Sequence, residues 1–449
     1  MATAAGLTLS LWFLARAGAN EPAPAVGGRA PSGAWVCPHG GGRGWTASLF
    51  LANPGPDDST ARLTELGSKA PETSTEIEVP PGQTVRVPVT AADRGSATVV
   101  EYFGGWMGAG WVTGSAGRAE GIAAEPCADE ASRRWFVADG STRQEEDSFV
   151  VIANPFDAPA VLDVAIHSPD RAPVRDSEWT DLVVRPRRSV ALRLDRKIEG
   201  ETVAAVDLEV SVGRVAAASL VVGDDTRIRS ALGSTATSAG TILPVIGGSG
   251  QVELIVFSVS DASIRFAATE LSDEPPRPAG GLTGQDHGPL AAQAYAVPVD
   301  AGPAAVRVFP LDDASVAGAL RALGPGEDLG STAGDTAPAP TWLVFPALDR
   351  GPAEPSLVLV NDGDDAAVAT LELLVGDGGT AAAPITVDVP PHAAAAVPPG
   401  FLASSPGSAV LVRSDGGDLV ALASSSAPAG RREGGAYALS VGVPVPHRP

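Results

Sequence analysis

The sequence of 449 residues repeats itself at a spacing of about one hundred residues. Three segments superpose, each beginning with a tryptophan and ending, after a short apolar run, in an asparagine. The asparagines are Asn53, Asn154 and Asn361; the first two lie 101 residues apart and the last two 207. A divergent fourth copy is therefore expected between them, near Leu243 and Asp261. Self-similarity at this period indicates tandem structural modules.

Each repeat contains short apolar runs separated by turn residues every 8 to 12 positions, and the chain holds 52 glycines and 40 prolines. This pattern is typical of seven short antiparallel strands in a two-sheet sandwich. The sequence predicts an all-β protein of tandem immunoglobulin-like antiparallel β-sandwich modules of about 100 residues. A propeller is the competing architecture, but its blades are typically about 40 to 50 residues long. Because Trp35, Trp135 and Trp342 are repeat-equivalent, we expect them in the module cores.

The repeat divides the chain into modules and connecting segments. The segment 1–20 is expected to be a signal peptide or signal anchor, and 21–33 a linker. The third module lacks the tryptophan, and its fold is the least defined by the sequence. Within it, 313–323 is expected to hold a short helix and 272–288 a long surface loop. The stretches 233–240 and 324–340 resemble linkers. The predicted modules span 34–128, 129–233, 241–330 and 341–449.

An apolar run from Leu7 to Leu14 is followed by the small-x-small sequence Ala15-Arg16-Ala17, which is typical of a signal-peptidase site. No basic residue precedes the run, so both a cleaved signal and an anchor are open. The chain is therefore expected to be secreted or at the cell surface, or anchored by this N-terminal segment.

The two cysteines, Cys37 and Cys127, flank the first module. An even cysteine count in an exported chain predicts a disulfide between them.

The formal net charge of −22 opposes binding to nucleic acid or to an anionic membrane surface. Both classes of partner are excluded on this ground.

The asparagines of the repeat each end an apolar run just before a proline or an Asp-Gly pair. An asparagine side chain at such a point hydrogen-bonds its own backbone and forms a turn. We therefore predict that Asn53, Asn154 and Asn361 are turn-forming residues rather than ligands.

Sequence patterns of catalysis are missing. There is no Walker loop and no G-x-S-x-G elbow, and no short metal-ligand spacing joins the histidines. The prediction is a protein that is not an enzyme and has no metal or cofactor. A hydrolase hidden in the third module would need His287 beside a carboxylate and a nucleophile. The scattered histidines are His39, His167, His287, His392 and His447.

The first module is richer in aromatic residues than its siblings. Tyr102, Phe103, Trp106 and Trp111 are expected on its final hairpin, around Gly104 and Gly105. Two interpretations stay open: the aromatic rings pack into the core, or they form a surface for a sugar ring or a protein partner.

The run Trp135-Phe136-Val137-Ala138-Asp139-Gly140-Ser141-Thr142, followed by Ala153-Asn154-Pro155, resembles a repeated module of exported actinobacterial proteins. The chain is similar, over most of 34–443, to an uncharacterised secreted family from high-GC actinobacteria. This resemblance implies neither an activity nor functional residues.

Together these features predict an exported, non-enzymatic structural or adhesive protein of the cell envelope. The alternative is an envelope polysaccharide-binding protein that uses the aromatic hairpin of the first module. The expected partner is an unknown protein or a cell-envelope polysaccharide, and no small-molecule substrate is evident.

Overall fold

The computed structural model describes most of the chain from residue 32 onward. The predicted signal segment, most of the first linker and His447 lie outside the described residues. Within the part that the structure describes, no helix combines the length and the hydropathy of a membrane-spanning segment. The described residues are 32–68, 74–115, 121–223, 227–247, 251–299, 302–323, 329–334, 337–346, 354–376, 379, 382–427 and 436–446.

The described residues form eight sheets of four or five strands, in which all neighbouring strands are antiparallel. The prediction of an all-β chain is confirmed. The sheets occur in pairs, and each pair is made by one repeat of the sequence.

The first repeat forms the sheets β1-β6-β3-β4 and β5-β2-β7-β8. Its strands are β1 (Gly33–Cys37), β2 (Thr46–Asn53), β3 (Ser59–Leu66), β4 (Ser74–Val79), β5 (Gln83–Val89), β6 (Ala97–Phe103), β7 (Gly108–Gly114) and β8 (Ile122–Pro126).

The second repeat forms the sheets β12-β11-β15-β9, with β13 beside β11, and β14-β10-β16-β17. Its elements are β9 (Arg134–Val137), β10 (Glu146–Asn154), β11 (Ala160–His167), β12 (Val174–Arg175), η1 (Ser177–Trp179), β13 (Leu182–Val184), β14 (Arg188–Arg193), η2 (Leu194–Arg196), β15 (Ala205–Val212), β16 (Ala216–Gly223) and β17 (Ile228–Arg229).

The third repeat forms β18-β23-β20-β21 and β22-β19-β24-β25, which is the strand order of the first repeat. Its strands are β18 (Thr241–Gly247), β19 (Gln251–Phe257), β20 (Ile264–Leu271), β21 (Arg277–His287), β22 (Ala292–Pro298), β23 (Gly302–Pro310), β24 (Ala317–Leu323) and β25 (Leu329–Gly334). Two expectations for this repeat were wrong. The expected helix is the strand β24, and most of the expected long loop is the strand β21, because both segments pair with a neighbouring strand.

The fourth repeat forms β29-β28-β31-β26-β34 and β30-β27-β32-β33. Its elements are β26 (Thr341–Val344), β27 (Glu354–Asn361), β28 (Ala367–Leu374), β29 (Ile385–Val389), β30 (Ala393–Ala396), α2 (Pro399–Ala403), β31 (Ala409–Asp415), β32 (Val420–Ala427), β33 (Ala436–Val441) and β34 (Val443–Pro444).

The strand order is not that of an immunoglobulin domain, whose first two strands lie in one sheet. In each repeat the first two strands lie in different sheets, and so do the strands that flank the predicted final hairpin, such as β6 and β7. The segment predicted as a final hairpin is therefore a crossing between two sheets.

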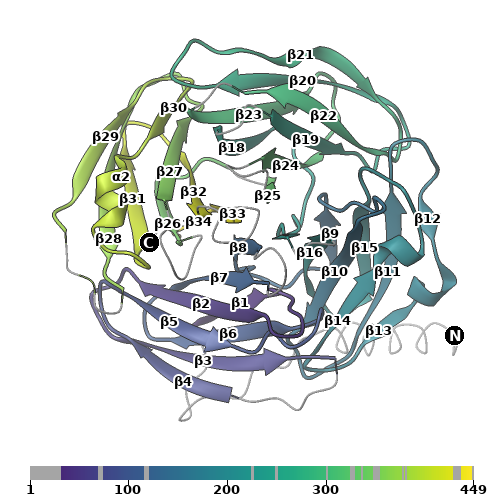
Figure 1. Ribbon diagram of the computed structural model, residues 1–449, viewed down its shortest axis with the longest axis horizontal. Helices are drawn as coiled ribbons and strands as arrows, with labels where there is room; N and C mark the ends of the chain where they lie inside the picture. The colour runs from purple at the N-terminus through teal and green to yellow at the C-terminus, as the bar shows by residue number, and fades with distance from the viewer. Residues whose placement is uncertain are drawn as a thin grey trace, which may run out of the picture.

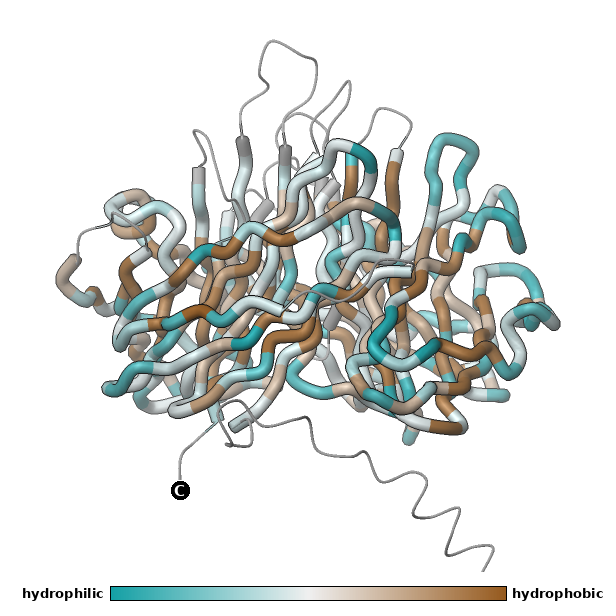
Figure 2. Tube along the Cα trace, turned by 90° about the horizontal axis from the view of Figure 1, so that it is seen from below, coloured by the Kyte–Doolittle hydropathy of each residue, from teal (hydrophilic) through white to brown (hydrophobic). Residues whose placement is uncertain are grey.

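The eight sheets stand around a common axis and close into a ring (Figure 1). The strands β8, β17, β25 and β33 lie innermost and contact one another in turn. Four-stranded sheets around an axis are the arrangement of a β-propeller. The chain does not run as a meander, in which consecutive strands are neighbours in one sheet. Each repeat instead alternates between two adjacent sheets. In the side view, apolar residues follow the strands and polar residues gather at the turns (Figure 2).

Ring closure buries both faces of the central strands. Leu49, Phe50 and Leu51 are consecutive in β2, and all three are fully buried. A sandwich with one solvated face would show alternation instead, whereas an unbroken apolar run fits a strand covered on both sides. The apolar core around Trp35 continues into Phe149 of the second repeat and Phe345 of the fourth.

The first and fourth repeats are joined directly, although they lie at opposite ends of the chain. The Thr84 N–H donates to the carbonyl of Val375 at 3.0 Å, and the Val375 N–H donates to the carbonyl of Gly82 at 3.0 Å. The Thr84 hydroxyl also donates to the carbonyl of Leu374. These bonds close the ring.

The segments expected as free linkers are held in place where the structure describes them. Ser234 pairs with Phe136, and Ser238 pairs with Val316, in isolated bridges. Part of the second segment, Leu329–Gly334, is the strand β25. These described residues, which resemble linkers in the sequence, therefore pair with the strands and segments of neighbouring repeats.

The predicted disulfide between Cys37 and Cys127 is formed, with the Cα atoms 4.4 Å apart. It joins the end of β1 to the residue that follows β8. These strands belong to the two different sheets of the first repeat, so the bridge fixes one sheet against the other.

The three repeat tryptophans are buried, each with 2% of its surface exposed. The indole N–H of Trp35 donates to the carbonyl of Met107, and that of Trp135 to the carbonyl of Val215. Trp342 makes the same bond to Leu419. The three acceptors lie just before β7, β16 and β32, so each tryptophan fixes the point where the chain crosses from one sheet to the other.

Candidate functional site

The repeat asparagines organise the turn that follows the second strand of each module. The Asn53 side chain accepts from the Gly55 N–H at 2.9 Å and donates to the carbonyls of Asp57 and Val79. Asn154 and Asn361 make the corresponding set of bonds. All three asparagines are fully buried. The amide therefore holds the turn residues at a fixed place beyond the end of the second strand.

The four aromatic residues singled out in the first module are not on one surface. Tyr102 and Trp111 are buried, with exposed fractions of 8% and 1%. Phe103 is half-buried beneath the Arg62 guanidinium, which lies 5.8 Å from its ring centre. Only Trp106, at the crossing between β6 and β7, is half-buried beside an open cavity.

This cavity, which we call the Trp106 hollow, has a volume of about 390 Å³. One wall is the turn held by Asn53, and the other is the crossing between the sheets. The hollow is lined by Gly55, Pro56, Asp57, Asp58, Gly104, Gly105 and Trp106.

The hollow combines an indole with two exposed carboxylates, Asp57 and Asp58. The Trp106 ring packs edge-on against the buried Trp35, with the centroids 6.1 Å apart. Gly104 has a φ of +101°, and a Cβ there would lie 3.2 Å from the Asp58 carbonyl oxygen. A larger residue at position 104 would be strained, so glycine lets the crossing between the sheets lie close to the Asp58 backbone.

The tryptophan wall of the hollow differs from the equivalent positions of the second and fourth repeats. The residue before the tryptophan-bound carbonyl is Trp106 in that repeat, Arg214 in the second and Asp418 in the fourth. The turn is shared among the repeats, while the aromatic wall is not.

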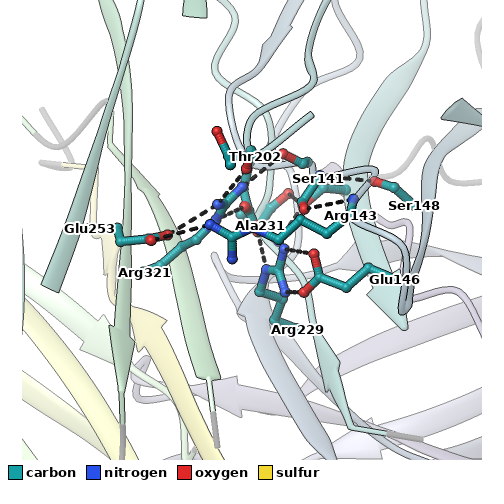
Figure 3. A network of polar contacts seen from close by, with 12 residues as sticks. Ser141, Arg143, Glu146, Ser148, Thr202, Arg229, Ala231, Glu253 and Arg321 are labelled. Carbon is teal, nitrogen blue, oxygen red and sulfur yellow. Dashed lines mark hydrogen bonds and ion pairs between the residues drawn. The ribbon is translucent and has the colours of Figure 1, made fainter. Parts of the chain in front are cut away.

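A second polar site lies deep between the second and third repeats, and we call it the charge network. The Asp139 carboxylate is fully buried and accepts from the Arg321 Nε at 2.6 Å. Its other oxygen lies 3.3 Å from the Arg229 Nε. Arg229 also pairs with Glu146 at 2.6 Å, and Arg321 with Glu253 at 3.2 Å (Figure 3).

Backbone acceptors complete the network. Arg321 Nη2 donates to the carbonyl of Gly140, and Nη1 donates to the carbonyl of Thr202. Since β24 supplies Arg321 and the second repeat supplies its acceptors, the network clamps two repeats together.

The charge network is ionised. Burial alone would raise the pKa of Asp139, but Arg321 and Arg229 outweigh it and lower that pKa to about 2. Burial also opposes ionisation of Glu146, and Arg229 lowers the pKa of that carboxyl to about 2.

The sequence pointed to Asp139 only as part of a motif and missed its partners. Arg229 and Arg321 follow Asp139 by 90 and 182 residues, with no local pattern that marks them. The signal that the sequence offered was the position of Asp139, two residues after the end of the buried strand β9.

The histidines occupy separate structural positions. His39 contacts the Gly40 carbonyl and the Thr98 hydroxyl, and burial lowers its pKa to about 4. His287 contacts the Tyr295 hydroxyl and the Ala291 carbonyl, so both of its ring nitrogens face partners other than a carboxylate. Among the described residues, no group of three or more His, Cys, Asp or Glu side chains is placed to hold a metal ion.

The protein is therefore an all-β ring of paired sheets that carries the Trp106 hollow on its first repeat and the charge network in its interior. The chain belongs to a family of unknown function, DUF5719, which matches residues 101–341. The match includes Trp106 and the whole charge network, but not Asp57 and Asp58. Among curated proteins, none matches the chain.

Proposed function

We propose that this protein is an exported, non-enzymatic adhesive scaffold of the cell envelope. Export is supported by the apolar N-terminal run and by the Cys37–Cys127 disulfide, which suits an oxidising compartment. A closed ring with shared cores suits a rigid platform, because no repeat moves without breaking apolar contacts with its neighbours. An origin in a secreted actinobacterial family is part of this proposal.

The adhesive contact that we propose is a polysaccharide held in the Trp106 hollow. The observation that carries this proposal is the half-buried indole beside Asp57 and Asp58. An indole face packs on the C–H face of a sugar ring, while carboxylates accept hydrogen bonds from its hydroxyl groups. Few polar groups around an aromatic wall are typical of ligand sites.

Retention of the protein on isolated cell-wall polysaccharide tests this proposal. We expect Trp106→Ala to weaken retention at least about tenfold, since a central aromatic contact often dominates binding. The double variant Asp57→Asn/Asp58→Asn is expected to weaken it less. Trp111 is unsuitable for this test because it lies in the core.

Trp45→Ala is the matched control. Trp45 is also half-buried in the first repeat, but it stacks with Arg94, whose guanidinium lies 4.4 Å from the ring, and it does not line the hollow. Thermal unfolding shows whether both variants stay folded. Equal retention of the wild type and Trp106→Ala would contradict the polysaccharide proposal, and recovery of the native protein only from the cytoplasm would contradict the envelope proposal.

A further inference from the structure

A second cavity lies near the centre of the ring, and we call it the axial pocket. It has a volume of about 340 Å³, within the range of about 300 to 1,000 Å³ common for small-ligand sites. The inner strands β8, β33 and β34 contribute to it (Figure 1). Segments from different repeats build its walls, so the pocket exists only in the closed ring.

The charged groups that line the axial pocket are all acidic. Glu125 lies in its wall with 2% of its surface exposed, while Asp129 and Glu130 are exposed. The described lining includes no lysine, arginine or histidine. Around these carboxylates the lining is mixed: the apolar side chains, with Trp35 and Trp342 among them, lie beside polar groups such as Ser234 and Thr235.

Glu125 is an unsatisfied buried carboxyl. The Leu232 N–H hydrogen-bonds to it, but Oε1 has no hydrogen-bond partner among the described residues. Burial raises the pKa of Glu125 well above its usual range, and the Asp139 carboxylate raises it further. A buried polar atom without a partner destabilises the folded chain, so such an atom calls for an explanation.

We propose that the axial pocket binds an organic cation, a primary ammonium group on an apolar stem, with the ammonium at Glu125. On binding, the Glu125 carboxyl releases its proton to solvent and Oε1 accepts one N–H of the ammonium, which supplies both the missing hydrogen bond and a charge that stabilises the carboxylate. The tryptophan-containing walls contact the stem, and Asp129 and Glu130 attract the cation at the opening. A metal ion suits the pocket less well, because among the described residues no group of three or more His, Cys, Asp or Glu side chains is placed to hold one.

Calorimetric titration of the full exported chain with n-pentylamine tests this inference. n-Pentanol and pentanoate serve as the neutral and anionic analogues of the same length. We expect saturable binding of one amine per chain, at least about tenfold weaker binding of pentanol, and no binding of pentanoate. Pentanol binding as tightly as the amine, or no saturable amine binding, would overturn the proposal without any variant being needed.

The variants locate the site. Glu125→Gln keeps the shape of the side chain and is expected to weaken amine binding at least about tenfold. Asp129→Asn/Glu130→Gln changes only exposed residues and is expected to give a smaller loss that shrinks at high salt. Amine affinity that is unchanged in Glu125→Gln would place the cation elsewhere and overturn the assignment.

This inference goes beyond the polysaccharide proposal and fails separately from it. Asp57→Asn/Asp58→Asn is expected to leave amine binding unchanged, because neither aspartate lines the axial pocket. Glu125→Gln is expected to leave polysaccharide retention unchanged for the same reason.

Discussion

Asp139 and Glu125 are both carboxyl groups buried inside the ring, yet their environments have opposite effects. Asp139 faces two arginines, which lower its pKa to about 2. The described lining around Glu125 holds no lysine, arginine or histidine, and burial raises the pKa of Glu125 well above the usual range. Burial is the same for both, so the partner decides the charge state. Each carboxyl keeps one oxygen without a hydrogen bond among the described residues, but Asp139 Oδ2 lies 3.3 Å from the Arg229 Nε, whereas Glu125 lies in the wall of a pocket.

Asp139 carries a charge that holds two repeats together, whereas the Glu125 carboxyl is left for a ligand. The charge network joins the second and third repeats, and each of its members has a partner of opposite sign. The Glu125 side chain accepts a hydrogen bond from the Leu232 N–H, while its Oε1 has no hydrogen-bond partner in the part of the chain that the structure describes. Changes at the two sites are therefore expected to differ in size and in sign.

The largest effect is expected from Arg321→Ala. This change leaves Asp139 buried without its closest cation, which costs about 3 to 5 kcal/mol of unfolding free energy. Urea unfolding measures the loss. Arg413→Ala is the control, because the Arg413 and Glu372 side chains are 52% and 42% exposed and their pair contributes about 1 kcal/mol or less. Equal losses in the two variants would show that the charge network does not clamp the ring.

Removal of the disulfide changes how the strand that carries Glu125 is held in the fold. In Cys37→Ala/Cys127→Ala, the strand β8 that carries Glu125 loses its covalent tie, and we expect a loss of about 2 to 5 kcal/mol. The measurement is denaturant unfolding of the double variant, alone and combined with Arg321→Ala. Since the two changes share no partner, their effects should add within about 0.5 kcal/mol. Strong non-additivity would mean that the two sites depend on each other.

Low pH is expected to reduce the stabilisation that the ionised Asp139 gives to the folded chain. Its folded pKa lies below the ordinary 3.8, so the stabilisation is complete above that value and is lost as the pH falls toward about 2. The lowering corresponds to about 2 kcal/mol. Unfolding free energies measured from pH 5 to pH 2 should fall more steeply in the wild type than in Asp139→Asn. Parallel curves would contradict the ionised network.

Glu125→Gln is expected to give the smallest effect on stability, with the opposite pH dependence. The folded pKa of Glu125 is raised, so its contribution is complete below the unfolded value and is lost as the pH rises through the folded value. The glutamine does not titrate, so the variant should equal or exceed the wild type in stability at pH 8. A variant that is clearly less stable there would show that Glu125 is internally paired.

The sequence by itself determined the elements whose causes are local. Repeated turn residues and short apolar runs were enough for an all-β chain, and the equivalent positions of Asn53, Asn154 and Asn361 marked one recurring turn. An even cysteine count in a chain with an apolar leader was enough for the Cys37–Cys127 bridge. The unbroken run Leu49-Phe50-Leu51 also carried a signal for burial on both faces, although it was interpreted as part of an ordinary sandwich.

Only the tertiary structure decided how the repeats associate and which polar groups meet. Closure of the ring depends on contacts such as Thr84 with Val375, and no local preference encodes a pairing across 291 residues. The same limit hid the partners of Asp139, because Arg321 lies 182 residues away. The aromatic residues of the first repeat separated into buried and half-buried groups once β6 and β7 entered different sheets. Burial and charge pairing are properties of the assembled ring, and therefore the sites became visible only in three dimensions.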